Sequence, residues 1–209
     1  MLTAASQLLH LVAFGAGVAE AINLAVSAVL LAGLATVAFV GTALIRTDLD
    51  RGTLALLLSQ PVGPAAYVLG RFLGLGAAAL CTCALTAGGA AVALLLAGAP
   101  DGVLSTALLL GWIRAFLAIL VLAAAALAVS AFASRILAPL LLLAVFLAGD
   151  VAPAAAASRL VPTFGVFGLD AGRPTPRAWL SLYAMLYCIV FLVATYLQLA
   201  LRPPKRAEG

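Results

Sequence analysis

Residues 24–45 read LAVSAVLLAGLATVAFVGTALI, and residues 46–61, which follow, read RTDLDRGTLALLLSQP. The first stretch carries no charge and, as a helix, is long enough to cross a hydrocarbon core about 30 Å thick. The second is the only place where charged residues cluster between two long apolar runs. Because charged side chains are costly inside a bilayer, we expect residues 46–66 to form a loop outside it.

The composition of the whole chain is that of an integral membrane protein. Of its 209 residues, 66% are hydrophobic and 9% are charged, against about 45–50% apolar and 25% charged residues in soluble domains. We expect one all-α transmembrane domain, residues 1–209, a bundle of about five spanning helices. The expected spans are residues 24–45, 67–97, 104–130, 136–150 and 179–201, with an outer loop at 151–178. The apolar stretch in residues 1–23 is too short to span, so this segment is expected to be an interfacial or solvent-side arm.

Two arginines inside apolar runs need a place near the membrane boundary. Arg71 is expected to reach the interface by snorkelling. A helix from Leu104 would put Arg114 deep in the membrane, whereas a helix from Trp112 would put it near the interface. We favour the second placement, because Trp112 fits an aromatic belt and a central arginine costs at least about 2.5–3.5 kcal/mol.

Small residues within the spans predict close helix packing. In the first span these residues are Gly33, Ala35 and Gly41, and in the second they are Gly74, Gly76, Gly88 and Gly89. The glycines of the second span are expected to pack in a homodimer or in the bundle, and a role in lining a substrate path is secondary.

Basic residues are distributed unequally between the two ends of the predicted bundle, which orients it by the positive-inside rule. The expected cytoplasmic end carries Arg46, Arg51, Arg71, Arg135, Arg202, Lys205 and Arg206, and the other end carries Arg159, Arg173 and Arg177, with Arg114 near its interface. With five spans the N-terminus lies outside and the C-terminus inside, an arrangement that normally implies a sixth helix upstream or an unusual route of insertion. We expect a multi-pass protein of the bacterial inner (cytoplasmic) membrane that contacts membrane lipid.

The charged loop itself is predicted to contain a short helix. Asp48 or Asp50 can cap it, Arg51 faces solvent, and Pro61 ends it. Its apolar stripe consists of Leu54, Leu57 and Leu58. Such a helix can lie in the groove of a partner protein. Alternatively, it can lie on the membrane surface, in which case residues 46–66 are only a polar hairpin with an interfacial helix and have no coupling role.

The loop resembles the first cytoplasmic loop of type-2 ABC exporter permeases. The residues that carry the resemblance are Asp48, Gly52, Thr53, Leu56, Leu57, Leu58, Gln60, Pro61, Val62, Tyr67, Gly70 and Arg71. The wider pattern is similar to permeases related to the nitrous-oxide-reductase copper-maturation system, whose last extracellular connection resembles residues 161–170. The resemblance covers most of residues 15–206, with two departures. Pro64 stands where a basic residue is usual, and the first of the family's usual six helices has no counterpart in residues 1–23.

The resemblance implies the membrane subunit of an ABC exporter, in which the loop forms a short cytoplasmic coupling helix. It implies a cytoplasmic ABC ATPase subunit that binds ATP and Mg²⁺ and grips the loop, and a permease homodimer. The implied coupling residues are Arg46, Asp48, Asp50, Arg51, Gly52, Thr53, Leu54, Leu57, Leu58, Pro61, Tyr67 and Arg71. Two alternatives stay open: a haem-exporter-like permease of cytochrome maturation, and a membrane scaffold or accessory subunit that transports nothing.

The residues favour transport over catalysis in this chain. It has no Gly-x-x-x-x-Gly-Lys-Ser/Thr loop, so ATP hydrolysis is expected in a separate subunit. The only histidine, His10, lies outside the expected spans, which disfavours a hydrolase or a metal enzyme. We expect no cofactor bound by this chain, and no nucleic acid partner, since its arginines flank apolar stretches.

Two further sets of residues are candidates for sites. Soft ligands at Cys81, Cys83, Met185 and Cys188 would suit Cu(I). Cysteine and methionine are also ordinary packing residues in apolar helices, and we predict no metal site. Asp101, Arg114 and Asp150 lie near the expected outer boundary and are candidates for an outer gate, or they mark helix ends.

Overall fold

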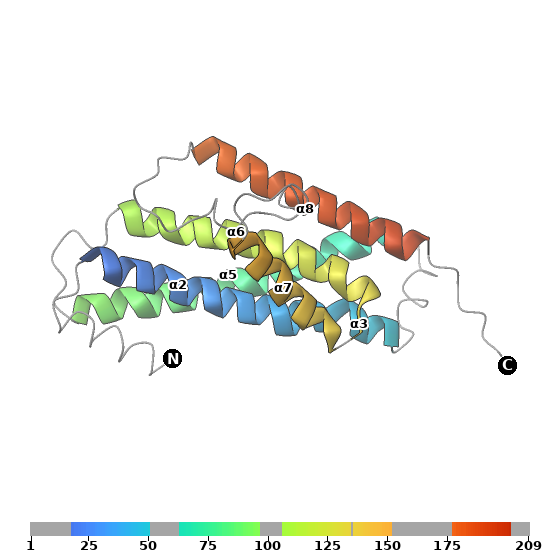
Figure 1. The fold of residues 1–209 in the computed structure, drawn as a ribbon, viewed down its shortest axis with the longest axis horizontal. Coiled ribbons are helices and arrows are strands. Elements are labelled where there is room, and N and C mark those ends of the chain that lie inside the picture. Colours follow the sequence, from blue (N-terminus) through green and yellow to red (C-terminus); the bar gives the residue numbers. More distant parts are fainter. Residues whose placement is uncertain (1–17, 51–62, 97–105, 135, 152–176, 202–209) are drawn as a thin grey trace.

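The described residues of the protein form a bundle of five helical rods. The computed structural model describes residues 18–50, 63–96, 106–134, 136–151 and 177–201 (Figure 1). In chain order the elements are α2 (Val18–Thr36), a π-helical turn η1 (Val37–Gly41), α3 (Thr42–Asp50), α5 (Pro64–Leu96), α6 (Thr106–Phe132), α7 (Leu137–Val151) and α8 (Arg177–Ala200). α2, η1 and α3 follow one another without a break and form a single rod, which we call the first rod.

Within the described ranges, four helices are long and apolar enough to cross a membrane. Their spanning stretches are Leu24–Ile45, Pro64–Ala93, Leu108–Phe132 and Trp179–Ala200. The first stretch has the predicted bounds. The helix that contains it is longer at both ends, because α2 begins at Val18 and α3 continues to Asp50. Residues 18–23 therefore continue the first helix and are not part of a separate arm.

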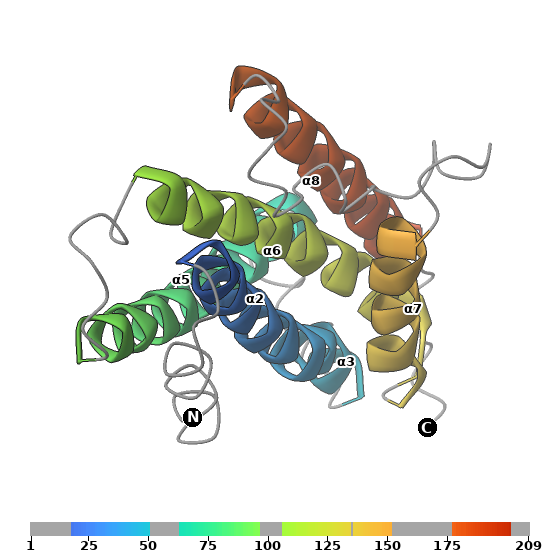
Figure 2. The same ribbon diagram turned by 60° about the vertical axis from the view of Figure 1, so that its left-hand side comes forward.

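The expected fifth span is too short. α7 has 15 residues, which gives about 22 Å of helix where about 30 Å is needed. Both ribbon views show α7 inclined to the long helices (Figures 1 and 2). The prediction of about five spans is therefore corrected, for the described residues, to four spanning helices and one shorter apolar helix.

The long helices alternate in direction along the first part of the chain. α2 and α6 begin at one end of the bundle, and α5 runs the opposite way between them in sequence (Figure 1). α8 begins at the same end as α2 and α6. The ends of α3, α6 and α8 therefore share one end of the bundle with the start of α5.

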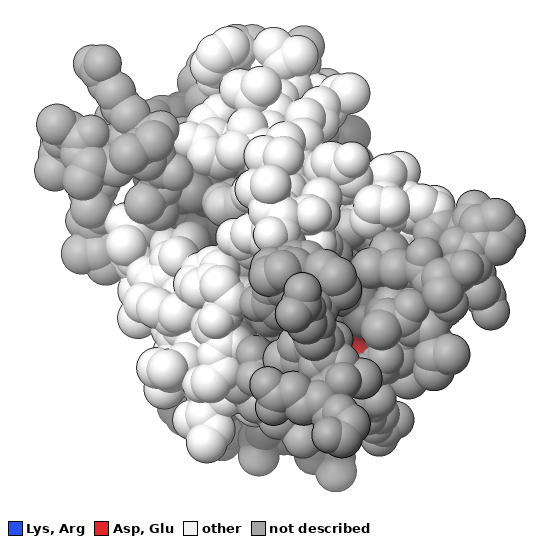
Figure 3. All heavy atoms as spheres, turned by 90° about the vertical axis from the view of Figure 1, so that its right-hand side faces the viewer, with Lys and Arg blue, Asp and Glu red and all other residues white. Residues whose placement is uncertain are grey.

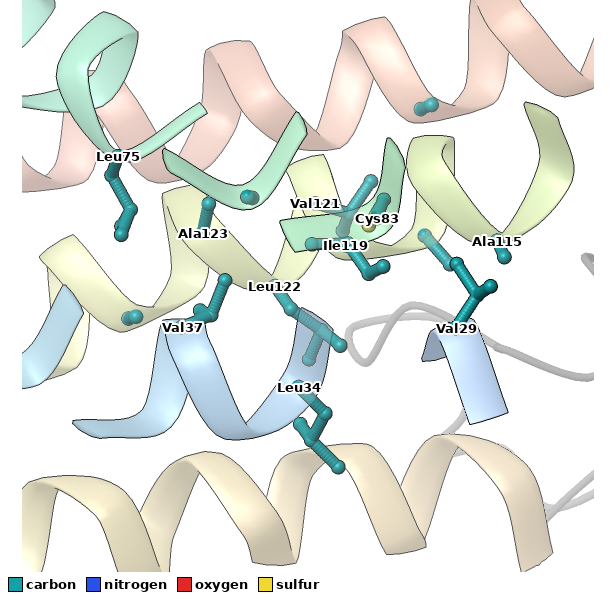
Figure 4. Packing of buried hydrophobic residues seen from close by; sticks show 14 of the residues in the cluster. Val29, Leu34, Val37, Leu75, Cys83, Ala115, Ile119, Val121, Leu122 and Ala123 are labelled. Carbon is teal, nitrogen blue, oxygen red and sulfur yellow. The ribbon is translucent and has the colours of Figure 1, made fainter. Parts of the chain in front are cut away.

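α6 is the central helix. It packs against the first rod, α5, α7 and α8, and residues 121–131 are all buried. A helix that is apolar on every side is expected in such a central position. The run Ala123–Ala126 at its middle lets neighbouring helices approach closely. Figure 4 shows part of this core, with Leu34 and Val37 from the first rod, Leu75 and Cys83 from α5, and Ile119 and Leu122 from α6.

The start of α6 differs from the favoured interpretation of the sequence. The helix begins at Thr106, not at Trp112. A span over residues 115–132 would still fall within the usual range of about 17–25 residues, and it would leave Arg114 at the boundary. Trp112 itself packs against the core, and its indole N–H is buried. It is therefore a packing residue more than a member of an aromatic belt.

Glycines set the closest contacts between helices. A Cβ atom on Gly33 would lie 2.2 Å from Ile119 Cδ1, and one on Gly41 would lie 2.8 Å from Leu75 Cδ2. The prediction of close packing at these two glycines is confirmed, whereas Ala35, predicted with them, is exposed.

The glycines of α5 behave differently. Within the described part of the chain, a Cβ on Gly74, Gly88 or Gly89 would meet no atom within 4 Å, while one on Gly76 would lie 3.4 Å from Leu120 Cδ2. Of the two predicted places for this packing, the bundle and a homodimer, the structure does not support the bundle for Gly74, Gly88 and Gly89. Their use between two copies of the chain stays a prediction.

Candidate functional site

The helices on both sides of the charged loop extend into it. α3 continues to Asp50 and α5 begins at Pro64, whereas the sequence predicts a loop over residues 46–66. Asp48 lies inside the last turn of α3, so it does not cap a following helix, and that interpretation is corrected. A capping role of Asp50 would concern residues that follow it, which lie outside the described residues.

Three polar side chains join the end of α3 to the start of α5. The Tyr67 hydroxyl donates a hydrogen bond to Asp48 Oδ2 over 2.6 Å. The Arg71 guanidinium donates through Nη2 to the same oxygen and forms an ion pair with it. The guanidinium carbon also lies 5.5 Å from the centroid of the Tyr67 ring, a cation–π distance. We call Asp48, Tyr67 and Arg71 the polar clamp.

Helical spacing explains why these residues can meet. Tyr67 and Arg71 are four residues apart on α5, so their side chains share one face of the helix. Asp48 reaches that face from the last turn of α3. The side chains of Arg71 and Asp48 are 32% and 15% exposed. Partial burial of each charge is costly, and the partner charge and the tyrosine hydroxyl offset that cost.

The clamp lies at the end of the bundle, beside the loop. α5 has 33 residues, or about 50 Å, and needs only about 20 of them to cross a bilayer. A span over residues 72–93 would leave Tyr67 and Arg71 outside the hydrocarbon. The expectation that Arg71 snorkels to the interface stays a prediction, and the structure adds that Arg71 binds Asp48.

The described surface at this end of the bundle carries little charge. Figure 3 views the end where α3 and α8 finish and α5 begins, and its described atoms are uncharged except for one small acidic patch. In the clamp, the opposite charges of Asp48 and Arg71 are paired with each other.

The other predicted coupling residues are not described in full. Arg51, Gly52, Thr53, Leu54, Leu57, Leu58 and Pro61 lie outside the described residues. Arg46 and Asp50 lie on α3, and the structure does not describe their side chains. Of the predicted coupling residues, the structure brings together Asp48, Tyr67 and Arg71.

The outer-gate hypothesis stays a prediction. Asp101 lies outside the described residues, and Asp150 lies on α7 with an undescribed side chain. Arg114 lies on α6 and is partly exposed.

The cysteines show no common site in the described part of the chain. Cys81 is exposed, Cys83 is buried, and Cys188 is half-buried. Among the described residues, no three His, Cys, Asp or Glu side chains lie close enough to hold a metal ion.

Sequence reasoning missed one feature of the first rod, the π turn η1 (Val37–Gly41). The available signal was weak. It consists of Thr36 and Thr42 on either side of the turn, whose hydroxyls bond to the carbonyl oxygens of Ala32 and Ala38 four residues back. Such bonds bend or loosen helices.

In comparisons with known proteins, no family model and no curated protein matched this chain. The described residues therefore establish a helical protein with four candidate membrane spans.

Proposed function

We propose that this chain is the membrane subunit of an ABC exporter, and that a cytoplasmic ATPase subunit grips its loop at residues 51–62. The observation that carries the proposal is the polar clamp. Asp48, Tyr67 and Arg71 belong to the set of residues that resembles a permease coupling loop, and they meet in space although 23 positions separate the first from the last.

The clamp suits a coupling role because it joins both helices that flank the loop. α3 continues the first rod, and α5 is the second spanning helix. Because the clamp ties their ends together, a force on the loop acts on both helices at once. A partner that moves the loop would then move two spans against α6, which packs on both.

In this proposal the chain supplies the pathway and the partner supplies the energy. ATP and Mg²⁺ bind to the ATPase subunit, and two copies of the permease enclose the translocation pathway. The arginine-rich end of the bundle faces the cytoplasm of a bacterium, where an ATPase can reach the loop.

A photo-cross-linking amino acid at Leu57 tests the proposal in membranes of the natural host. We expect an adduct with a protein that contains a phosphate-binding Gly-x-x-x-x-Gly-Lys-Ser/Thr loop, identified by mass spectrometry. The same amino acid at Leu201, an exposed residue at the end of α8, is the matched control and should give no such adduct. Equal adducts at both positions, or no ATPase adduct at Leu57, would overturn the proposal.

A second measurement uses the purified complex. Leu57→Asp and Gly52→Pro should reduce its ATP hydrolysis rate, because both disturb the helix that the ATPase is proposed to hold. Unchanged hydrolysis in both variants would contradict the lever role of the loop. Haem that co-purifies with the complex would favour the haem-exporter alternative, and a complex without any ATPase would favour a scaffold.

A further inference from the structure

The π turn η1 lies in the middle of the first spanning stretch. π turns are uncommon, and when they interrupt an α-helix they are often found at functional sites. Thr36, just before the turn, donates its hydroxyl to the Ala32 carbonyl oxygen over 2.9 Å. Thr42, just after it, donates to the Ala38 carbonyl oxygen. Both bonds compete with the regular helix and loosen it at this point.

The turn determines which face of the first rod is buried. Buried residues recur every four positions, at Ala25, Val29, Gly33, Val37, Gly41 and Ile45. In a regular α-helix each such step rotates about 40° past a full circle, so the stripe would drift by about 200° over 20 residues. A π turn acts like one inserted residue and offsets about 100° of this drift. It therefore keeps Gly41 against Leu75 of α5 and Ala126 of α6.

The same turn positions the polar clamp. Asp48 lies seven residues after Gly41, on the helix that leaves η1. If η1 became regular α-helix, α3 would rotate by about 100° relative to α2. On a helix about 10–12 Å wide, this rotation moves a side chain by about 8 Å, enough to separate Asp48 from Tyr67 and Arg71.

The outer side of the turn leaves room for such a change. Phe39 is 75% exposed and Val40 is 45% exposed, so neither anchors the turn in the core. The anchored residues are Val37 and Gly41, one at each end of η1.

We propose that η1 is a hinge that switches between a π form, in which the polar clamp is closed, and a regular α-helical form, in which Asp48 has left α5. The clamp and the π turn stabilise each other, because each requires the same rotation of α3. The inference rests on the proposed function only in that clamp opening would move the loop at residues 51–62. The switch itself requires no ATPase.

The test measures the position of α3 relative to α5 in the full chain. Spin labels replace Thr47 on α3 and Leu85, an exposed residue of α5, after Cys81→Ser, Cys83→Ala and Cys188→Ala. Leu85 lies 14 residues, or about 21 Å, along α5 from Arg71. Distances are measured by double electron–electron resonance in lipid nanodiscs.

Two variants of Val40 separate a hinge from general flexibility. Deletion of Val40 removes the extra residue of the π turn. It should leave a regular helix in which the buried faces of α2 and α3 keep their present alignment. Val40→Ala removes the same side chain but keeps the chain length, so it is the matched control. We expect two distance components in the chain with Val40 and in the Val40→Ala chain, and one component after the deletion.

The clamp supplies the second arm of the test. The minor distance component is expected to come from the α-helical form with the open clamp. In the chain that keeps residue 40, Asp48→Asn should raise the share of this component by about threefold or more. It should change nothing in the deletion variant. The hinge proposal would be wrong if the intact chain showed a single distance component and Asp48→Asn left that component unchanged. If the deletion variant does not fold, the response of the Val40→Ala chain to Asp48→Asn decides alone. None of these results depends on an ATPase, so the hinge and the proposed function can fail separately.

Discussion

At the scale of single residues, the polar clamp makes a prediction about charge. Arg71→Met removes the guanidinium that pairs with the Asp48 carboxylate, which is only 15% exposed. We expect a loss of about 1–3 kcal/mol in stability, since solvent screens part of the charge. The double variant Asp48→Leu, Arg71→Met leaves no charge behind and should recover most of this loss. Thermal unfolding in detergent measures both.

The hydroxyl of Tyr67 gives a second, smaller prediction at the same site. Tyr67→Phe removes the donor of the 2.6 Å hydrogen bond to Asp48 and should cost about 1.5 kcal/mol, because the acceptor is charged. Tyr196→Phe, at an exposed tyrosine of α8, is the control and should stay within about 0.5 kcal/mol of the wild type. Equal effects of the two substitutions would mean that the hydroxyl of Tyr67 contributes nothing specific.

At the scale of elements, packing of the first rod on α6 depends on a missing side chain. A Cβ at Gly33 would lie 2.2 Å from Ile119 Cδ1, and Ile119 is fully buried. Gly33→Ala should therefore cost about 1–3 kcal/mol through overpacking. Adding Ile119→Ala removes the clashing atoms, so the double variant should lose less than the sum of the two single losses. Gly74→Ala, which meets open space, should be neutral or slightly stabilising.

The elements also show what apolar runs predict and what they leave undetermined. The run from Leu24 to Ile45 gave the first spanning stretch correctly, because hydrocarbon tolerates few charges. It did not give the helix ends, because a helix continues outside the hydrocarbon through Asp48 wherever its backbone bonds are satisfied. Residues 136–150 are apolar enough to span, but α7 is too short. The π turn was not predicted. It ends at Gly41, which packs against Leu75 and Ala126 from other helices, and such tertiary contacts cannot be read from the local sequence.

The sequence predicted which residues belong to the candidate site, but it did not predict how they contact one another. Charge placed Asp48 and Arg71 at the same end of the bundle, and resemblance grouped them with Tyr67. Their direct contact depends on the rotation of α3 about its axis, which the sequence pattern does not specify. The sequence interpretation considered one helix at a time, so it did not predict that Asp48 on α3 binds Tyr67 and Arg71 on α5.

At the scale of the whole molecule, burial is concentrated in one helix. α6 is buried along most of its length, whereas α5 and α8 expose wide apolar faces. This distribution suits a bilayer, in which lipid can cover exposed leucines at no hydrophobic cost. In the proposed coupling, this burial suits α6 to be the fixed element against which the first rod and α5 would move.

Helix direction makes the last prediction, which concerns sidedness. The ends of α3, α6 and α8 share one end of the bundle, and α8 begins at the other (Figure 1). The positive-inside rule places the shared end in the cytoplasm. In a chain without its native cysteines, single cysteines at Thr47, Ser134 and Leu201 should react with a membrane-impermeant maleimide only in inside-out vesicles. A cysteine at Trp179 should react only in right-side-out vesicles.

Because α7 is too short to cross alone, Trp179 is the decisive position. Its reaction in inside-out vesicles would mean that the chain does not return across the membrane between α6 and α8, and that α8 runs opposite to α6.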